Sequence, residues 1–343
     1  MNRKYTPIQI IGTQRSGSNL LRLMINELDS VVAPHPPHIL KSFMPLLGQY
    51  GDLNENVNFE LLIDDVCRLV ETNPVVWENV ELDRYEILNK SIDRNLVNIF
   101  KNVYEQMAAA NNAKFWCCKS MANVKYANQI EEMGLNPLYI RLIRDGRDVA
   151  TSFKNVAVGE KHIYHLAHYW NDLQKKSEEL VQQIGPERAI TIKYEELIQE
   201  PEKVMNQVCS FLGVPYSESV FNYFQSEESK HTAESGFMWS NVTRPIIKNN
   251  SDKYKTLLTV EEVAIFESIA GNMLTKNGYA ISNSSPINIS SEDVLRFDME
   301  NEKLKRQTLK QEHLIIDLQK KVDQENLLKE IKARKVVALA ETA

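Results

Sequence analysis

Short runs of consecutive apolar residues alternate along the first 280 positions with stretches where apolar residues recur every three or four positions. The runs predict buried strands, and the wider spacing predicts helices with one buried face. The predicted strands are 8–11, 31–33, 115–118, 138–143 and 189–194. The main predicted helices are 20–28, 57–72, 93–110, 123–134, 201–213 and 260–277. This alternation favours an α/β domain of three layers, with helices on both faces of a central parallel sheet.

The first predicted strand leads into the turn Gly12-Thr-Gln-Arg-Ser-Gly-Ser18, and the first helix follows at once. Such a turn directs several backbone N–H groups and a helix N-terminus at one point, which suits a phosphate group. Gly12 and Gly17 allow the backbone to bend sharply, and Arg15 adds a fixed positive charge. The turn is not a Walker A loop, because Gly17 is followed by Ser18 and Asn19 instead of Lys-Ser/Thr.

Two other predicted strands also end in charged residues. Lys119 follows strand 115–118, and Arg144-Asp-Gly-Arg-Asp148 follows strand 138–143. Open α/β sheets bind ligands at the carboxyl ends of their strands. We therefore expect these side chains to face the same ligand as the glycine-rich turn.

Composition narrows the class of partner and the compartment. The net charge of −6 gives no general reason to expect nucleic-acid binding. The four cysteines form no Cys-x-x-Cys pattern and read as reduced thiols, so we expect a cytoplasmic protein. No signal peptide and no membrane-spanning stretch is expected. His162, His165 and His168 are more typical of a helix face than of a metal site, so no metal is expected.

Three stretches together resemble the sulfotransferases that use 3′-phosphoadenosine 5′-phosphosulfate (PAPS). Residues 12–21, Gly-Thr-Gln-Arg-Ser-Gly-Ser-Asn-Leu-Leu, resemble the family's 5′-phosphosulfate loop. Residues 144–152, Arg-Asp-Gly-Arg-Asp-Val-Ala-Thr-Ser, resemble its 3′-phosphate motif, and residues 193–215 resemble a downstream segment. The Arg-Ser-Gly of the first loop is closest to the bacterial and tyrosylprotein-type branch. The resemblance implies a P-loop-like domain at 1–283.

The resemblance assigns roles to individual residues of the donor site. Arg15 and Lys119 would act on the sulfuryl end of the donor, Lys119 by reaching the sulfuryl or bridging oxygen. Arg144 and Ser152 match the pair that holds the 3′-phosphate, and Tyr194 matches an aromatic beside the adenine. The remaining donor-binding candidates are Ser16, Gly17, Ser18, Asn19, Arg244 and Lys248.

The general base departs from the family pattern. Cytosolic members carry a histidine two positions after the matching lysine, where this chain has Met121. The tyrosylprotein branch takes a glutamate from the loop after the first helix. Here that loop is Pro-His-Pro-Pro-His at 34–38, so His35 is the candidate base and His38 the alternative. Both histidines could also be plain loop residues.

We therefore expect a sulfotransferase that acts on a hydroxyl of a carbohydrate, a lipid or another metabolite. One alternative is a P-loop-like kinase, which the missing Gly-Lys-Ser/Thr and the lack of a Mg²⁺-holding aspartate disfavour. The other is a non-catalytic nucleotide-binding scaffold that oligomerises through its C-terminal region. Met121 is the main support for the scaffold, because it cannot accept a proton.

The C-terminal region differs from the rest in composition. Residues 284–291 are rich in Ser, Asn and Pro and predict a linker. From Val294 to Val322 a heptad pattern favours one helix over 292–337, able to pair as a coiled coil and to form a homo-oligomer. Asn301 would then occupy a core position and set the register. Residues 338–343 are expected to form a short tail.

Overall fold

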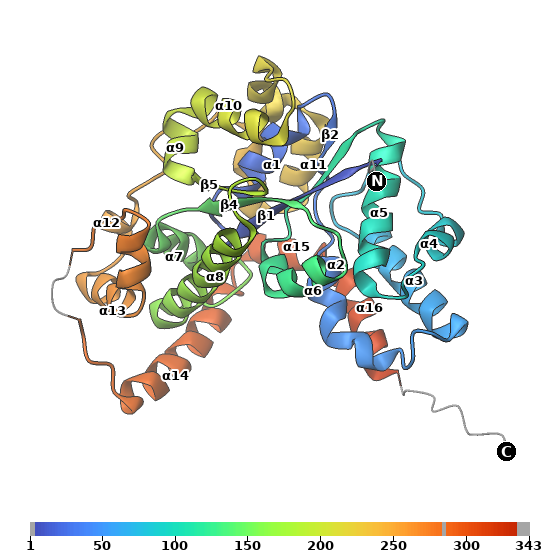
Figure 1. The fold of residues 1–343 in the computed structure, drawn as a ribbon. Helices are drawn as coiled ribbons and strands as arrows, with labels where there is room; N and C mark the ends of the chain where they lie inside the picture. The colour runs from blue at the N-terminus through green and yellow to red at the C-terminus, as the bar shows by residue number, and fades with distance from the viewer. Residues whose placement is uncertain (1–3, 283–285, 335–343) are drawn as a thin grey trace.

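A five-stranded parallel sheet lies at the centre of the computed structural model, which describes residues 4–282 and 286–334 (Figure 1). The strand order is β2-β3-β1-β4-β5. The strands are β1 (Thr6–Gly12), β2 (Val31–Val32), β3 (Phe115–Cys118), β4 (Leu138–Ile143) and β5 (Ala189–Lys193). These agree with the five predicted strands. β1, β3 and β4 are buried along nearly their whole length, as strands of a doubly covered parallel sheet are.

The glycine-rich turn comes from the middle of the sheet. β1 pairs with β3 on one side and with β4 on the other, and both pairings are parallel. The carboxyl ends of these three strands therefore meet at one edge. The segments that begin at Thr13, Lys119 and Arg144 leave the sheet side by side there, as the sequence predicts.

Helices cover both faces of the sheet, which confirms the three-layer α/β prediction (Figure 1). Ile8 and Ile10 point toward the upper helices, and Ile11 points toward the lower ones. The upper helices are α1 (Ser18–Asn26), α9 (Tyr194–Gln199) and α10 (Pro201–Leu212). The lower ones are η2 (Met121–Tyr126), α6 (Ala127–Glu132) and α8 (Ile163–Ile184).

Further helices flank the two edges of the sheet. Beside β2 and β3 lie α2 (Ile39–Phe43), η1 (Met44–Gln49), α3 (Asn56–Glu71), α4 (Arg84–Lys90) and α5 (Leu96–Ala110). Packed toward the β4 side are α7 (Gly146–Lys154), α12 (Tyr254–Leu257) and α13 (Val260–Lys276). Between α10 and α12 come η3 (Glu218–Gln225), α11 (Glu227–Glu234) and η4 (Phe237–Thr243).

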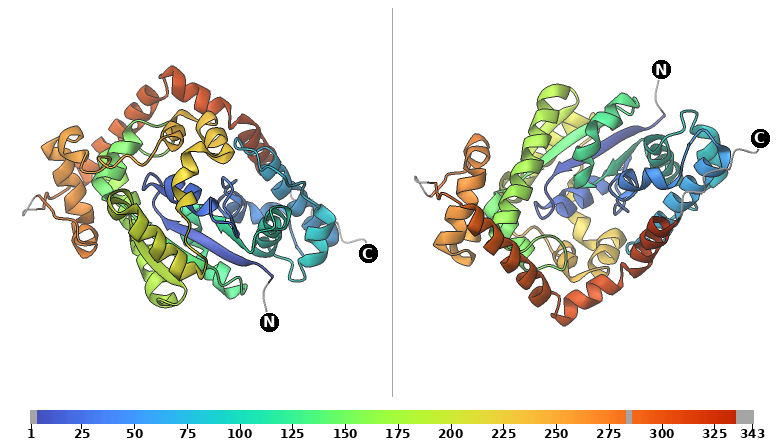
Figure 2. Two further views of the ribbon diagram at one scale, coloured as in Figure 1. Left: turned by 90° about the horizontal axis from the view of Figure 1, so that it is seen from above. Right: turned by 90° about the horizontal axis from the view of Figure 1, so that it is seen from below.

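The prediction of one C-terminal helix over 292–337 is wrong. The region is helical, but it forms α14 (Ser291–Thr308), α15 (Glu312–Gln319) and α16 (Val322–Ala333). These three helices, here called the C-terminal strap, run along the outside of the domain from α13 toward α3 (Figure 2). The domain boundary at 283 and residues 335–343, which include the expected tail, lie outside the described residues.

The strap docks on its own domain, and this explains why the heptad fails. Along α14 the heptad positions Phe297 and Asn301 are buried, but in α15 Leu314 is buried while the heptad residue Ile315 is exposed. Asn301 does not set a coiled-coil register. Its side-chain oxygen accepts hydrogen bonds from the backbone N–H groups of Lys161 and His162, at 2.9 and 3.0 Å. Homo-oligomerisation through this region stays a prediction.

Two features bear on location without deciding it. The four cysteines are buried and unpaired. Within the described residues, no helix is both long and apolar enough to span a membrane. A cytoplasmic location stays a prediction.

Candidate functional site

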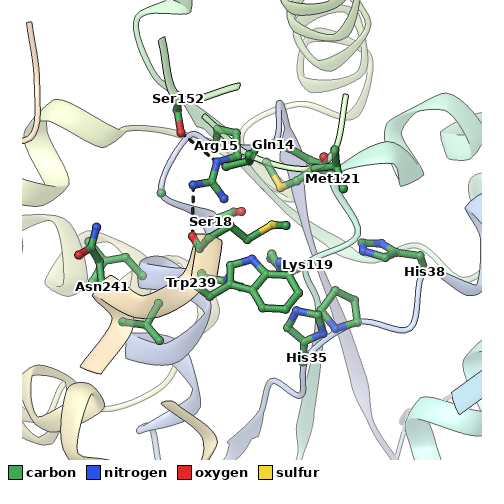
Figure 3. Close-up of a pocket in the computed structure, with 18 of the residues that line it drawn as sticks. Gln14, Arg15, Ser18, His35, His38, Lys119, Met121, Ser152, Trp239 and Asn241 are labelled. Atoms are coloured by element: carbon green, nitrogen blue, oxygen red, sulfur yellow. Dashed lines mark hydrogen bonds between the residues drawn. The ribbon is translucent and has the colours of Figure 1, made fainter. Parts of the chain in front are cut away.

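A cavity of about 1010 Å³ opens at the carboxyl edge of the sheet (Figure 3). Its floor is formed by the glycine-rich turn and by Lys119, and one wall comes from the loop that carries His35. Further parts of the wall come from η4 and from the strap, which contributes residues of α16. Five separate segments of the chain therefore enclose one space.

The glycine-rich turn has a backbone that exposes its N–H groups. Arg15 and Gly17 both have positive φ, 67° and 85°, and such a turn forms a concave set of amides. A Cβ on Gly17 would lie 2.3 Å from the Tyr194 ring, so only glycine fits there. Gly17 also begins α1, and no side chain of the described residues caps this helix end. The first amides of α1 are therefore available to an anion.

The Arg15 side chain is oriented by neutral groups. Its Nε–H donates to the hydroxyl of Ser152 at 2.9 Å, and Nη2 donates to the carbonyl oxygen of Met238 at 3.2 Å. Burial, and then the charge of Arg144, lower the pKa of Arg15 to about 10. Arg15 therefore stays charged at neutral pH, and its charge is not cancelled by a carboxylate of the described residues.

Arg144 is stacked and almost fully buried. Its guanidinium lies 4.6 Å from the centre of the Tyr194 ring, and it donates to the carbonyl oxygens of Arg15 and Asn250, at 3.1 and 2.8 Å. Asp148 lies 3.5 Å away. The buried Nε of Arg144 has no hydrogen-bond partner among the described residues, so one donor remains for a ligand.

Lys119 is a buried cation without a counter-ion. Its side chain is 7% exposed, and no described carboxylate lies within ion-pairing distance of it. Burial holds the pKa of Lys119 well below its usual range, and the charges of Arg22 and Arg15 lower it further. A site that gathers unpaired cations in this way is stabilised when an anion binds.

The ring of His35 faces the same cavity and has both nitrogens free. Neither nitrogen has a hydrogen-bond partner among the described residues, and the ring lies 4.7 Å from that of Trp239, edge to face. Figure 3 shows the two rings side by side. The carbonyl oxygen of His35 accepts a hydrogen bond from the indole N–H of Trp77 at 2.7 Å. The backbone N–H of His35 donates to the carboxylate of Glu228 at 3.1 Å. The backbone is therefore fixed while the ring remains available.

His38 also lines the cavity, but its ring is already engaged. Its Nδ1 lies 2.6 Å from the hydroxyl oxygen of Ser120, and its backbone has a φ of 62° just before α2. Burial lowers the pKa of both histidines well below the ordinary value, and the charge of Lys119 adds to the effect. Both rings are therefore neutral near pH 7, which a proton acceptor requires.

The structure brings most of the candidate residues together. Those that line the cavity are Arg15, Gly17, Ser18, Asn19, His35, His38, Lys119, Arg144, Ser152, Tyr194 and Arg244. Two others do not line it. The Ser16 hydroxyl turns inward to the Thr13 hydroxyl, 2.9 Å away, and Lys248 is exposed with its carbonyl oxygen bonded to Gln199 at 2.7 Å. Their side chains therefore lie outside the cavity, and a role for either residue in donor binding stays a prediction.

Several cavity residues were not predicted. Lys253 and Asn250 lie within the stretch 244–253, which also holds the candidates Arg244 and Lys248. They could have been chosen together with those two residues. Lys41 lies on α2, one turn after His38, and carries no motif. Lys321 and Gln324 come from the strap, and no local signal in the sequence places them at the site.

The comparisons with known proteins point to one family. A family model described as the sulfotransferase family matches residues 7–218. Protein-tyrosine sulfotransferase A of Caenorhabditis elegans is 22% identical over 86% of this chain and 72% of its own length. Protein-tyrosine sulfotransferase of Drosophila melanogaster is 23% identical over 65% of this chain. The matched region covers 41% of the length of the fly protein.

Two solved structures share the fold. The sulfotransferase domain of the Synechococcus PCC 7002 olefin synthase has a TM-score of 0.53 and 19% identity, over 79% of this chain and 97% of that domain. The sulfotransferase domain from the curacin biosynthetic pathway has a TM-score of 0.55 and 21% identity, over 82% of this chain and all of that domain. The P-loop-like fold is therefore confirmed. The family match, and not the shared fold, argues against the kinase and scaffold alternatives. Because the family model matches more than half of its residues, this chain belongs to the sulfotransferase family and is a sulfotransferase.

Proposed function

We propose that this enzyme transfers a sulfuryl group from PAPS to a hydroxyl group of a carbohydrate, a lipid or another metabolite. The observation that carries the proposal is the convergence of Arg15, Lys119 and Arg144 on one cavity that also holds the free ring of His35. The cations suit a donor with several phosphate and sulfate oxygens. The neutral imidazole suits an acceptor whose proton must be removed.

The donor site fits a nucleotide with phosphates at both ends. The amides at the start of α1 and the Arg15 guanidinium would hold the 5′-phosphosulfate. Gly17 leaves open the space beside Tyr194, which a Cβ would fill. Arg144 and Ser152 would hold the 3′-phosphate, and the unpartnered Nε of Arg144 supports this role. PAPS supplies a sulfuryl group that is already attached to a phosphate leaving group.

His35 would act as the general base. It accepts the proton of the acceptor hydroxyl while the acceptor oxygen bonds to sulfur and the bond from sulfur to the bridging phosphate oxygen breaks. The bridging oxygen gains negative charge in this step, and Lys119 and Arg15 would stabilise it. The products are a sulfate ester and adenosine 3′,5′-bisphosphate. His35 is preferred over His38, because both ring nitrogens of His35 lack a partner among the described residues, whereas Nδ1 of His38 pairs with Ser120 and leaves only Nε2.

A second acceptor class has a specific observation in its favour. The curated relatives are named protein-tyrosine sulfotransferases, so the phenolic hydroxyl of a tyrosine in a peptide is the other candidate. Against it stands the strap, whose residues form part of the cavity wall.

The test is a transfer assay with PAPS labelled in its sulfuryl group. The full chain is incubated with pooled hydroxylated fatty acids, sterols and sugars in one arm and with tyrosine-containing peptides in the other. Label on a small hydroxylated acceptor supports the proposal. Label on peptides alone would show that the acceptor is the hydroxyl of a tyrosine. Sulfate transfer to neither, with tight PAPS binding, contradicts the assignment of the acceptor.

A further inference from the structure

The C-terminal strap forms part of the acceptor side of the cavity. Lys321 lies where α15 and α16 meet, and Lys321, Gln324, Glu325, Leu328 and Lys332 all line the cavity. The Lys321 ammonium lies 5.5 Å from the centre of the Trp239 ring. Trp239 in turn packs on His35. Lys321 is therefore placed on the same side of the site as the proposed base.

The strap is anchored, so the position of Lys321 is well defined. Asp317 is 3% exposed, and its carboxylate accepts hydrogen bonds from the backbone N–H groups of Phe237 and Met238, at 2.6 and 3.4 Å. Gln324 donates to the carbonyl oxygen of Leu69 at 2.8 Å. Near the end of α16, Arg334 pairs with the fully buried Asp65. These contacts lie on both sides of Lys321 and join it to η4 and α3.

Lys321 and Lys41 are positive groups without a counter-ion at the site. No described carboxylate lies within ion-pairing distance of either ammonium, although Asp317 and Glu325 act on Lys321 from farther away. Burial lowers the pKa of the half-buried Lys321, and the charge of Lys41 lowers it further. Both lysines line the same cavity, and α16 packs on η1, which directly follows α2. An anion bound in this part of the cavity would compensate both charges.

The donor does not account for these two charges. Its predicted contacts are the glycine-rich turn, Lys119, Arg144 and Ser152, which lie on the sheet side of the cavity. Lys41 and Lys321 come from α2 and from the strap, beyond the His35 loop. The cavity lining also includes the apolar side chains of Leu46, Leu328 and Trp239.

We propose that Lys321 and Lys41 form an anion subsite for the acceptor, so that the acceptor carries a carboxylate or phosphate on an apolar body as well as its hydroxyl. The inference rests on the proposed function and narrows its acceptor class. Lys321 becomes a specificity-determining residue that the strap supplies.

A binding experiment tests the subsite without knowledge of the true acceptor. The full chain is saturated with adenosine 3′,5′-bisphosphate and titrated by calorimetry with octanoate, octyl phosphate and octanol, which share one apolar body. A charge-assisted contact predicts that at least one of the two anions binds roughly ten- to a hundredfold more tightly than octanol. Octanoate and octyl phosphate separate a carboxylate from a phosphate as the preferred group.

Two variants locate the effect. Lys321→Ala and Lys41→Ala should each remove most of the preference for the anion and leave octanol binding unchanged. The matched control is Lys329→Ala, because Lys329 is an exposed lysine of α16 that does not line the cavity. Equal affinity for octanol and both anions overturns the proposal, and so does an equal loss for all three ligands in Lys321→Ala.

The donor measurement keeps this inference separate from the proposed function. If Lys321→Ala weakens binding of the bisphosphate as much as Arg144→Ala does, Lys321 belongs to the donor site and the subsite is wrong. If the bisphosphate does not bind to the unmodified chain, the proposed donor fails. Titration of the chain without nucleotide then still tests whether the anions are preferred.

Discussion

The Nε–H of Arg15 donates to the hydroxyl of Ser152 at 2.9 Å, although 137 positions separate the two residues. Arg15 follows β1 and Ser152 lies in α7, which follows β4, and these strands are neighbours in the sheet. The hydroxyl orients the guanidinium without cancelling its charge. A carboxylate in the place of Ser152 would orient it equally well, but it would compete with an anionic donor.

Removal of the Arg144 guanidinium should weaken the donor site selectively. We expect Arg144→Ala to bind adenosine 3′,5′-bisphosphate about ten- to a hundredfold more weakly, since a charge-assisted contact contributes about 1.5–3 kcal/mol. The affinity for AMP, which lacks the 3′-phosphate, should fall much less. Calorimetry with both nucleotides measures the difference. Lys248→Ala is the control, because Lys248 does not line the cavity, and an equal loss in that variant contradicts the assignment.

Removal of the His35 imidazole should slow the reaction without affecting donor binding. A missing general base lowers turnover by about 10²–10⁴, so we expect this loss in kcat for His35→Ala. His38→Ala should lose less, because the His38 ring is engaged with Ser120. Steady-state kinetics and bisphosphate binding are measured on both variants. Near-normal turnover in His35→Ala would show that His35 is not the base. Loss of donor binding in that variant would show that the loop has a structural role.

The pH dependence of the rate should reflect the burial of His35. Its pKa is held well below the ordinary value, first by burial and then by the charges of Lys119 and Arg22. A lowered pKa keeps the ring unprotonated as the pH falls, so the base is not lost near pH 6.5. We expect kcat/KM for the acceptor to stay level down to about pH 6.5 and to fall only below it. A profile that already halves near that pH contradicts a buried base.

The sequence located the donor side of the site because that side depends on local patterns. Apolar runs marked β1, β3 and β4, and the carboxyl ends of parallel strands share an edge, so Lys119 and Arg144 had to lie near the glycine-rich turn. The direction of individual side chains did not follow from the pattern. Ser16 was expected to face the donor, but its hydroxyl pairs with Thr13 behind the turn.

The acceptor side could not be predicted in the same way. Apolar residues at 314, 315, 316 and 318 fit more than one helical phase, and the contact of Asp317 with η4 selects the phase that buries Leu314. That contact joins positions about 80 apart, and no periodicity in the sequence records it. The placement of Lys321 depends on it, so the cavity wall became visible only in the folded chain.

A buried ion pair supports the His35 loop from behind. Arg22 is fully buried and pairs with Glu228 at 2.5 Å, and Glu228 also accepts the N–H of His35. Glu228→Gln would leave the Arg22 charge without its partner, which should lower the free energy of unfolding by about 3–5 kcal/mol. Urea unfolding of the full chain measures this. The neighbouring Glu227→Gln is the control, because its pair with Lys230 is exposed, and equal small effects in both variants would show that the buried pair contributes little.

The contact between Asp317 and η4 should matter more for the acceptor than for the donor. Asp317→Ala leaves two backbone N–H groups of η4 without their acceptor, and η4 carries Trp239, which packs against His35 and Lys321. We expect KM for the acceptor to rise about tenfold or more, since each lost contact to a charged group is worth about 1.5–3 kcal/mol. Affinity for adenosine 3′,5′-bisphosphate should fall less, because only the Met238 carbonyl oxygen joins η4 to Arg15.

Kinetics and nucleotide binding are compared in Asp317→Ala and in Asp323→Ala, an exposed aspartate on the same strap. Circular dichroism at the assay temperature confirms that both variants are folded. A rise in acceptor KM in Asp317→Ala alone, with donor affinity nearly kept, fits a strap that holds the acceptor wall in place. If donor affinity falls as far as acceptor affinity does, the strap supports the whole cavity. If neither changes, η4 keeps its position without Asp317, and the strap is not needed to form the wall.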